Sequence, residues 1–536
     1  MASHSAPVDG SLVSDRSEPP ISLGHEIARR PPWPLWAVAT LIVSLSSWCF
    51  CRVNLSTIQD LGPWLPVYLV KLGIELIASS FATFYLLVAA CYRPPGNSQP
   101  PQVFKNIADR LAVAYLCCDD LDENALHSLV DFCARTGTRL VIHDDSKSEE
   151  NRSFVDQVGS EINKRYPRVQ ILRRPDRSGG KPGAVNNLVK HLAPEIRYLL
   201  LCDSDSLLLD QDLLEHTLAM FDDPQVALVQ FRNTGSRSLS DPPTYQRLTE
   251  SSDFYDAVVS FIDEFGWSPF LGHNAVIRLS AFHAVGGFTP GQLADDIDFS
   301  AKLRLAGHKI LYARPVRCGE RHPHTHEALR RRTAKWAYGC TQVLLRWAKP
   351  IITSPILTVS EKVSFFLTVG YYHFQSLLLL YLTIFYLVLP FEHSRPIAMR
   401  SLLMSASLIL LLTFFPSITY FARNGTIKDW PQTAACWGLT YGSQDFIIVK
   451  AIIRCLLRKT MPWVPTNRQD NTPSASSFAY EVCFGLLILA VALARRPVLL
   501  ILPTTALFAG KFLLTPWLDK WIFKEKTPAP SPLLRR

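Results

Sequence analysis

The segment Tyr198-Leu-Leu-Leu-Cys-Asp-Ser-Asp205 places a short apolar run directly before two carboxylates. Such a run, bounded by polar turn residues, predicts a buried β-strand over 198–202. The alternation Asp203-x-Asp205 places both carboxylates on one side of an extended segment. A second apolar run, 138–143, ends in the same way, at Asp144-Asp145-Ser146. Ligands of α/β sheets bind beyond the carboxyl ends of the strands, so we expect these two acidic loops to lie together.

Outward from these two runs, residues 103–350 alternate short apolar runs with helical stretches. This alternation predicts an α/β domain with a mostly parallel sheet. The predicted strands are 111–116, 138–143, 169–172, 198–202, 226–231 and 275–277, and the predicted helices are 123–135, 149–165, 183–192, 210–221 and 295–306.

A third acidic cluster, Asp295-Asp296-x-Asp298, follows the turn Gly286-Gly-Phe-Thr-Pro290. Acidic groups on three loops can hold a divalent cation and keep one carboxylate as a base, because hard cations prefer oxygen ligands. Taken singly, each acidic pair is better explained as a solvated turn or a helix N-cap. Their occurrence in order on one α/β scaffold favours a functional site.

A glycine-rich segment, Ser178-Gly-Gly-Lys-Pro-Gly-Ala-Val-Asn-Asn187, lies between the first two acidic loops. A glycine-rich turn that opens a helix and contains a lysine suits a phosphate-bearing ligand. It is not a P-loop, because the Gly-Lys-Ser/Thr ending is absent. A plain loop followed by a helix start remains the alternative.

Composition separates a soluble part from apolar segments. Of the 536 residues, 48% are hydrophobic and only 19% are charged, against about 25% charged in soluble proteins. The deficit lies in windows without any charge: 33–51, 76–92, 363–391, 401–422, 482–494 and 497–510. The window 363–391 exceeds the length of a bilayer crossing. This composition excludes a disordered chain and argues against a purely soluble enzyme.

Charge and cysteine usage exclude two further classes. The net charge of +9 is spread along the chain, much of it beside the apolar segments. This pattern is typical of cytoplasmic anchoring and argues against nucleic acid as a partner. The 12 cysteines form no CxxC pair, and Cys49, Cys51, Cys91 and Cys483 lie in apolar runs. We therefore expect reduced, buried thiols rather than a disulfide scaffold.

The distribution of Lys and Arg predicts about six membrane crossings with the large central region in the cytoplasm. Residues 431–457 are apolar but interrupted, which favours an interfacial amphipathic helix over a further span. The predicted organisation is a cytoplasmic tail (1–32), two transmembrane helices (33–92), a cytosolic domain (103–350), two transmembrane helices (355–423), a cytoplasmic segment (424–476), a transmembrane hairpin (477–518) and a cytoplasmic tail (519–536).

The motifs of 105–345, taken in order, resemble those of the membrane-embedded family-two glycosyltransferases, which include cellulose, hyaluronan and other β-glycan synthases. The matching motifs are Asp144-Asp145-Ser, Lys181-Pro-Gly-Ala-Val-Asn-Asn, Asp203-Ser-Asp205, Gly272-His-Asn-Ala-Val-Ile-Arg278, Gly-Gly-Phe288, Ala294-Asp-Asp296 and Arg332-Thr-Ala-Lys-Trp336. The resemblance implies a glycosyltransferase-A-type α/β domain inserted in an α-helical transmembrane bundle of about six helices.

The same resemblance implies a role for each matching residue. Asp296 would be the catalytic general base, and Mg²⁺ or Mn²⁺ would be the cofactor. The implied donor-binding residues are Asp144, Asp145, Lys181 and Asp203; the metal ligands are Asp205 and Asp203; the residues for acceptor and diphosphate are Arg332, Lys335, Trp336, Asp295 and His273.

Trp463-Val-Pro-Thr466-Asn-Arg468 resembles the gating loop of that family, with Trp463, Thr466 and Arg468 as gating residues. A juxtamembrane linker explains the same segment equally well. The run His322-Pro-His-Thr-His326 has the ligand types of a zinc site. A loop leading into the next helix is the favoured explanation for it.

Three departures from the family pattern stand out. The family's Gln-x-x-Arg-Trp is Arg332-x-x-Lys335-Trp336 here, and Arg and Lys are not interchangeable at a bidentate contact. The Thr-Glu-Asp triplet is Ala-Asp-Asp, so Asp295 has a shorter reach. The first strand ends in Cys117-Cys118-Asp119-Asp120 where many relatives have Tyr-Asn-Glu. Both Asp119 and Asp120 are candidates to replace that acid.

The resemblance implies an enzyme that transfers a sugar from a UDP-sugar to the growing end of a β-glycan. The transfer would invert the anomeric centre at the cytoplasmic face of the plasma (inner) membrane and be coupled to export of the polysaccharide through the bundle. Expected partners are the UDP-sugar, a glycan acceptor, the lipid bilayer and accessory export proteins. The alternatives are a non-processive transferase that acts on a lipid or short glycan, and a transporter with a regulatory soluble domain.

Overall fold

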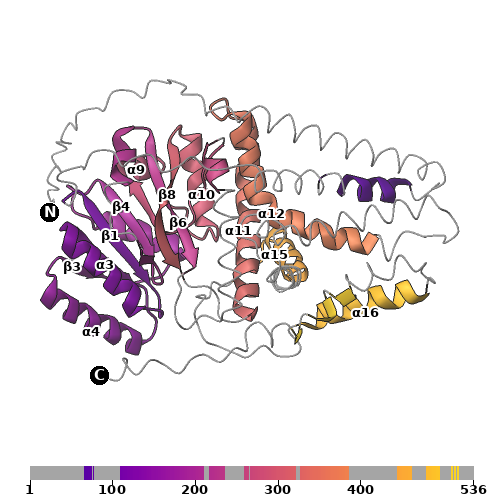
Figure 1. Ribbon diagram of the computed structural model, residues 1–536, viewed down its shortest axis with the longest axis horizontal. Coiled ribbons are helices and arrows are strands. Elements are labelled where there is room, and N and C mark those ends of the chain that lie inside the picture. Colours follow the sequence, from indigo (N-terminus) through magenta and orange to yellow (C-terminus); the bar gives the residue numbers. More distant parts are fainter. Residues whose placement is uncertain are drawn as a thin grey trace, which may run out of the picture.

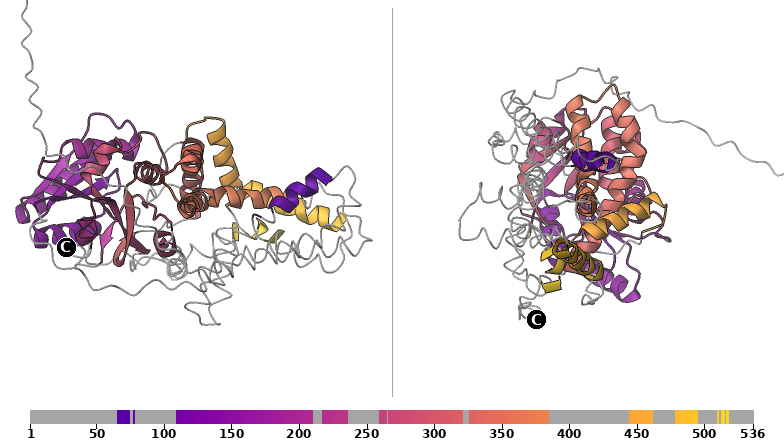
Figure 2. Two further views of the ribbon diagram at one scale, coloured as in Figure 1. Left: turned by 90° about the horizontal axis from the view of Figure 1, so that it is seen from above. Right: turned by 90° about the vertical axis from the view of Figure 1, so that its right-hand side faces the viewer.

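The computed structural model describes two regions, an α/β domain and a group of helices, at opposite ends of its long axis (Figures 1 and 2). The described residues are 65–74, 77, 109–209, 217–235, 259–264, 266–320, 326–384, 444–461, 478–494 and, with gaps at 511 and 515, 509–517.

The α/β domain is built on a mixed sheet of eight strands in the order β3-β2-β1-β4-β7-β6-β8-β5. The strands are β1 (Leu111–Cys117), β2 (Arg139–Asp144), β3 (Val169–Leu172), β4 (Tyr198–Asp203), β5 (Leu207–Leu208), β6 (Val226–Gly235), β7 (Ala275–Arg278) and β8 (Lys309–Glu320). All six predicted strands are therefore present, and the α/β class is confirmed.

The sheet is mixed, but four of its seven strand pairings are parallel, which agrees with the predicted mostly parallel sheet. Strands β3, β2, β1 and β4 run parallel to one another and β6 runs parallel to β8, whereas β7 pairs antiparallel with both β4 and β6, and β5 pairs antiparallel with β8. The three buried apolar residues of β7 carry no sign of strand direction, so sequence could not reveal this reversal. The twelve-residue β8 was also missed, because Arg314, Pro315 and Arg317 interrupt its apolar pattern.

Helices cover both faces of the sheet. They are α3 (Glu123–Thr136), α4 (Glu149–Arg165), α5 (Gly180–Lys190), α9 (Leu279–Ala284) and α10 (Asp295–Leu305), with a 3₁₀ turn at Met220–Asp222. Helix α3 begins where the Asp122 carboxylate accepts hydrogen bonds from the backbone N–H groups of Asn124 and Ala125. Four of the five predicted helices are confirmed. Of the fifth, 210–221, residues 210–216 lie outside the described part of the chain.

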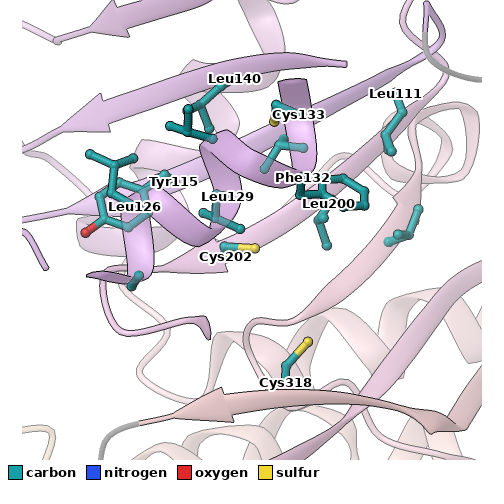
Figure 3. Packing of buried hydrophobic residues seen from close by; sticks show 14 of the residues in the cluster. Leu111, Tyr115, Leu126, Leu129, Phe132, Cys133, Leu140, Leu200, Cys202 and Cys318 are labelled. Atoms are coloured by element: carbon teal, nitrogen blue, oxygen red, sulfur yellow. The ribbon is translucent and has the colours of Figure 1, made fainter. Parts of the chain in front are cut away.

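The alternation of side chains along β1 separates the two cores. Val113 and Tyr115 pack with α3 and α4 on one face. Figure 3 shows Tyr115 beside Leu126 and Leu129 of α3. Ala112 and Ala114 pack with α5, α9 and α10 on the other face. All four residues are fully buried. Because β1 is central and covered on both sides, it reads as a continuous apolar run rather than an alternating one.

The second region contains α11 (His326–Thr353), α12 (Val359–Thr383), α15 (Asp445–Leu456) and α16 (Ala479–Ala494). Helix α11 packs against α10 of the α/β domain through Ala301 and Val343, and against α15 through Ala337 and Ile448. It is therefore the element that joins the two regions (Figure 1). The described part of the predicted interfacial helix 431–457 is α15.

Among the helices that the structure describes, none has both the length and the apolarity needed to cross a bilayer. The predicted spans over 33–51, 76–92, 401–422 and 497–510 lie wholly or almost wholly outside the described residues.

The described cysteines are all free thiols, as predicted. Six of these eight are buried, four of them in the α/β core, but Cys483 is exposed on α16, so the prediction of its burial was wrong. Helix α16 also exposes Leu486 and Leu487, which shows that an apolar sequence alone does not identify the packed face.

Replacing Leu129 of α3 by alanine tests the packing of this domain. Leu129 is fully buried in the core that α3 shares with β1. The substitution removes apolar contacts and leaves a cavity, so we expect the free energy of unfolding to fall by about 2–5 kcal/mol. Urea unfolding followed by circular dichroism measures it. The matched control is His127→Ala on the exposed face of α3, and an equal loss in both variants would contradict this packing.

Candidate active site

An ion pair between α5 and β4 forms the centre of the site. The Lys181 Nζ lies 2.6 Å from Asp203 Oδ1 and 2.7 Å from Oδ2. The same ammonium donates a hydrogen bond of 2.9 Å to the Gly272 carbonyl oxygen. The lysine thus connects the end of β4, the start of α5 and the loop before β7. Its charge outweighs the effect of burial and holds the pKa of Asp203 below its usual value.

Glycines allow the Lys181 segment to fold tightly. Gly179 and Gly180 adopt positive φ angles of 74° and 60°, which favour glycine. A Cβ atom at Gly183 would lie 2.2 Å from the Ser178 carbonyl oxygen, so no larger residue fits there without a shift. The predicted loop followed by a helix start is confirmed, and α5 begins at Gly180 rather than at the predicted 183.

The acids after β2 are paired with arginines. Asp144 is buried and accepts hydrogen bonds from Arg173 Nε at 2.7 Å and from Ser146 N at 2.8 Å. Asp145 forms a bidentate pair with Arg174, at 2.9 and 2.6 Å. Asp144 therefore organises the loop from within, while the partly exposed Asp145 is the one at the surface of the site.

Arg173 and Arg174 are functional candidates that the sequence reasoning missed. They directly follow β3, at the same edge of the sheet as Asp144 and Asp145. Arg174 also donates to the carbonyl oxygens of Ser178 at 2.7 Å and Gly180 at 2.9 Å. The signal that could have revealed them was their position after a predicted strand, where α/β folds bind ligands.

The structure distinguishes the two acids after β1. Asp119 has a positive φ of 64° and accepts hydrogen bonds from the backbone N–H groups of Lys147 and Ser148, so it connects two loops. Asp120 instead accepts a hydrogen bond of 2.9 Å from Ser204 Oγ, within the Asp203-Ser204-Asp205 loop. Burial, together with the charges of Asp203 and Asp205, raises the pKa of Asp120 to about 6. Asp120 is therefore the acid that faces the site.

Asp295 and Asp296 begin α10 and face the same cluster of charges. Burial raises the pKa of both carboxyls, and the charge of Asp295 contributes to raising that of Asp296 to about 7. A Cβ atom at Gly272 would lie 3.4 Å from Asp296 Oδ2, so the loop before β7 passes directly beside this carboxylate. The predicted base thus lies beside the loop whose carbonyl group holds Lys181.

Asp298 belongs to the architecture rather than to the site. It is fully buried and accepts hydrogen bonds from Thr289 Oγ1 at 2.6 Å and Trp347 Nε1 at 2.7 Å. These bonds connect α10 with the preceding turn and with α11.

Helix α11 places the ammonium group of Lys335 near the carboxylates of the site. Burial lowers the pKa of Lys335, while the charges of Asp295, Asp203 and Asp296 act in the opposite direction. The Arg332 guanidinium instead stacks on the Trp336 ring, with 4.6 Å between its carbon and the ring centroid. The Trp336 side chain is 38% exposed, so part of its surface is open to solvent.

His273 lies in the site, but both of its ring nitrogens have protein partners. Nε2 lies 3.2 Å from Glu320 Oε2, and Nδ1 lies 3.3 Å from Ser206 Oγ. The hydrogen bond with Glu320 and the charge of Asp203 outweigh burial and raise the pKa of His273 to about 9. The structure therefore places this predicted diphosphate-binding residue among polar protein groups, and Glu320 is a further residue that sequence reasoning missed.

The oxygen donors present suit a hard divalent cation. Asp203 and Asp205 lie close enough to Asp120 that their negative charges raise its pKa. Mg²⁺ is commonly bound by one or two carboxylates together with substrate phosphates. Within the described residues no group of three side chains has the arrangement of a complete metal site. Both oxygens of Asp203 contact Lys181, so Asp205 is the better candidate for direct coordination.

Two predicted groups cannot be placed. Trp463, Thr466 and Arg468 lie outside the described residues, as does most of the histidine run 322–326.

Replacing Asn186 by alanine tests how the site is assembled. Asn186 of α5 donates a hydrogen bond to the Phe288 carbonyl oxygen at 2.8 Å and accepts one from Phe288 N at 2.9 Å. Its removal leaves two buried backbone groups unpaired, so we expect the free energy of unfolding to fall by about 1–3 kcal/mol. Urea unfolding measures this change. Asn124→Ala on the exposed surface of α3 is the control, and an Asn186→Ala variant as stable as this control would refute the contact.

Comparisons with known proteins agree with this geometry. Residues 198–423 match the family model described as Glycosyl transferase family group 2. Glucomannan 4-beta-mannosyltransferase 7 from Arabidopsis thaliana is 26% identical over 235 residues, covering 42% of this chain and 41% of that protein. Beta-monoglucosyldiacylglycerol synthase from Synechocystis is 26% identical over 219 residues, covering 40% and 44% respectively. The chain thus spans less than half the length of these curated relatives.

A solved structure, the mannosyltransferase from Pyrobaculum calidifontis in complex with GDP-Man and Mn²⁺, aligns with 74% of this chain and 98% of its own, at 16% identity and a TM-score of 0.46. The family match includes β4, the acidic start of α10 and the Lys335-Trp336 segment of α11. Residues 198–423 of this chain are therefore similar to glycosyltransferase family group 2.

Proposed function

We propose that this protein is an inverting glycosyltransferase that extends a β-glycan from a UDP-sugar. The observation that carries the proposal is the convergence of Asp203, Lys181, Lys335 and Asp296 at one edge of the sheet, in a chain whose residues 198–423 match a family-two model. This group combines cations for a diphosphate with a carboxyl group whose pKa lies near neutral pH.

Asp296 serves as the general base in this mechanism. Its carboxylate takes the proton from an acceptor hydroxyl while that oxygen forms a bond to the anomeric carbon of the donor. The bond between the anomeric carbon and the diphosphate oxygen breaks at the same time, which inverts the configuration and releases the nucleoside diphosphate. The raised pKa of Asp296 suits this role, because a base works best when its pKa is near the working pH.

Lys181 and Lys335 stabilise the negative charge that develops on the leaving diphosphate. Both ammonium groups are held in place before the reaction, because Lys181 pairs with Asp203 and Lys335 faces Asp295. A Mg²⁺ or Mn²⁺ ion held by Asp205 and Asp203 would neutralise part of the same charge. The exposed part of the Trp336 side chain offers a stacking surface for an acceptor sugar.

We further propose that the domain is cytoplasmic, in a multi-pass plasma-membrane protein that exports its product. The uncharged windows of the sequence and the Lys and Arg beside them support this orientation. The names of several similar proteins, the glucomannan 4-beta-mannosyltransferases, support a polysaccharide product. A single transfer to a lipid is the second candidate, because one similar protein is named a glucosyldiacylglycerol synthase.

Release of nucleoside diphosphate from purified protein tests the proposal. With Mn²⁺ we expect activity with at least one UDP-sugar in a panel that also contains GDP-sugars, and loss of activity with EDTA. Asp296→Asn should lower kcat by about 10²–10⁴ because the base is lost, whereas nucleotide binding should persist. The matched control, Asp298→Asn, should affect stability rather than the pH profile, since Asp298 is bonded within the architecture.

Failure with every nucleotide sugar would overturn the proposed activity. Gel sizing and organic extraction of the product then separate its two forms. A high-molecular-mass glycan supports extension, and a product that extracts into organic solvent supports single transfer to a lipid.

The pH profile is a further prediction. Asp296 must be deprotonated to act as the base, and burial together with Asp295 raises its pKa to about 7. The positive charges of Lys181 and Lys335 face the same carboxyl and lower its pKa, but burial and the charge of Asp295 outweigh them. We therefore expect kcat to rise through an acidic limb with a midpoint near that value and to fall about tenfold for each pH unit below it. A kcat that stays constant from pH 5.5 to 8 in folded protein would contradict the assignment.

A further inference from the structure

A chain of polar contacts leads from the end of β8 to the Asp203-Ser204-Asp205 loop. Glu320 Oε2 lies 3.2 Å from His273 Nε2, and His273 Nδ1 lies 3.3 Å from Ser206 Oγ. Ser206 Oγ accepts a hydrogen bond of 2.9 Å from the backbone N–H of Asp203. Three side chains therefore connect the end of β8, which also pairs with β5 directly after this loop, to the carboxylates proposed to bind the cation.

Each group in this chain has a partner of the right type. The carboxylate of Glu320 accepts from His273 Nε2–H, which leaves Nδ1 to interact with the Ser206 hydroxyl. Ser206 is fully buried, and the side chains of His273 and Glu320 are mostly buried, so these bonds compete little with water. Removing the acceptor at Glu320 would leave the imidazole free to rotate and would weaken its contact with Ser206, whose Oγ would still accept from the Asp203 backbone N–H.

The backbone on both sides of His273 is also held. Gly272 and Asn274 have positive φ angles of 95° and 53°. The buried Gln230 side chain donates to the carbonyl oxygens of His273 at 3.0 Å and Asn274 at 3.1 Å, and it accepts from Leu271 N at 2.8 Å. Since the main chain of this turn is held by Gln230, the His273 ring orientation depends chiefly on its two side-chain partners.

The Asp203-Ser204-Asp205 loop is held from the opposite side as well. Ser204 Oγ donates to Asp120 Oδ2 at 2.9 Å, and the Ser204 carbonyl oxygen accepts from the Tyr115 hydroxyl at 3.0 Å. Asp120 and His273 thus contact the side chains of Ser204 and Ser206, the two serines that flank Asp205. Carboxylates held in this way need less reorganisation when a cation binds, and outer partners of this kind commonly affect metal affinity about 10–100-fold.

We propose that Glu320 is a positioning residue for the cation site and acts through His273 and Ser206 on the loop that contains Asp203 and Asp205. The inference rests on the proposed function for its metal, but the contacts that carry it involve only side chains of this protein. Glu320 does not itself touch the reacting atoms.

Two measurements on the full-length chain test this proposal without any sugar transfer. Hydrogen–deuterium exchange of peptides that contain 203–206 reports on the loop in the absence of metal. Electron paramagnetic resonance of Mn²⁺ titrated in the presence of UDP reports on cation binding. The variants are Glu320→Ala, Glu320→Gln and, as the matched control, Asp223→Asn. Asp223 pairs with Lys309 at the opposite end of β8, with 2.9 Å between Nζ and Oδ2.

We expect Glu320→Ala to accelerate exchange at 203–206 and to weaken Mn²⁺ binding about 10–100-fold. Glu320→Gln should retain most of the affinity, because its amide oxygen can still accept from His273 Nε2–H. Asp223→Asn should match the wild type in both measurements. This rescue by Gln separates positioning by a hydrogen bond from a general loss of structure.

Unchanged exchange at 203–206 in Glu320→Ala would overturn the proposal, as would equal effects in Glu320→Ala and Asp223→Asn. Should Glu320→Ala fail to fold, the Glu320→Gln and Ser206→Ala variants decide: Ser206→Ala must reproduce the faster exchange. A wild-type protein that binds no Mn²⁺ with UDP would instead refute the proposed metal dependence, and the exchange data would still show whether Glu320 positions the loop.

Discussion

The ion pair between Lys181 and Asp203 is the interaction on which the site depends. Burying charged groups is costly unless they are paired and hydrogen-bonded. Lys181 contacts both oxygens of Asp203 and also the Gly272 carbonyl group. One ammonium therefore makes it feasible to bring together a strand end, a helix start and a loop that are far apart in the sequence. Without this positive charge, the carboxylates of Asp295 and Asp296 at the start of α10 would repel that of Asp203 more strongly.

Backbone close approach is the second constraint, and it explains why glycines surround the cluster. The space beside Gly183 is filled by the Ser178 carbonyl group. A Cβ atom at Gly339 of α11 would lie 2.5 Å from Ala294 N, directly before Asp295. The absence of a side chain at Gly339 lets α11 approach the start of α10, which brings Lys335 to the acids. The packing of small residues thus decides where the charges meet.

Much of the α/β domain could be predicted from its sequence, because its strands are short apolar runs that end in acidic turns. Asp203 was predicted as a site residue for this reason, Lys181 from its glycine-rich segment, and Asp296 from the acidic cluster that follows the turn at 286–290. The antiparallel direction of β7 and the presence of β8 could not be predicted, because strand direction and pairing depend on partners distant in the sequence. Glu320 was missed with β8, since a residue on an unrecognised strand cannot be assigned to an edge of the sheet. The roles of Asp119 and Asp120 also needed the structure, because neighbouring residues with the same chemistry differ only in where their side chains point.

Burial and an excess of carboxylates together raise the pKa of Asp296. The carboxylates of Asp120, Asp203, Asp205, Asp295 and Asp296 face fewer cations, chiefly Lys181, Lys335 and His273. Burial is the larger cause of the raised pKa of Asp120 and Asp296, and repulsion from neighbouring carboxylates adds to it, whereas the charge of Lys181 contributes most to lowering the pKa of Asp203. A divalent cation arriving with a nucleotide would add positive charge beside Asp203 and Asp205. That charge would favour loss of the proton from Asp120, which faces the same loop, so binding would ready the site electrostatically before any bond is broken.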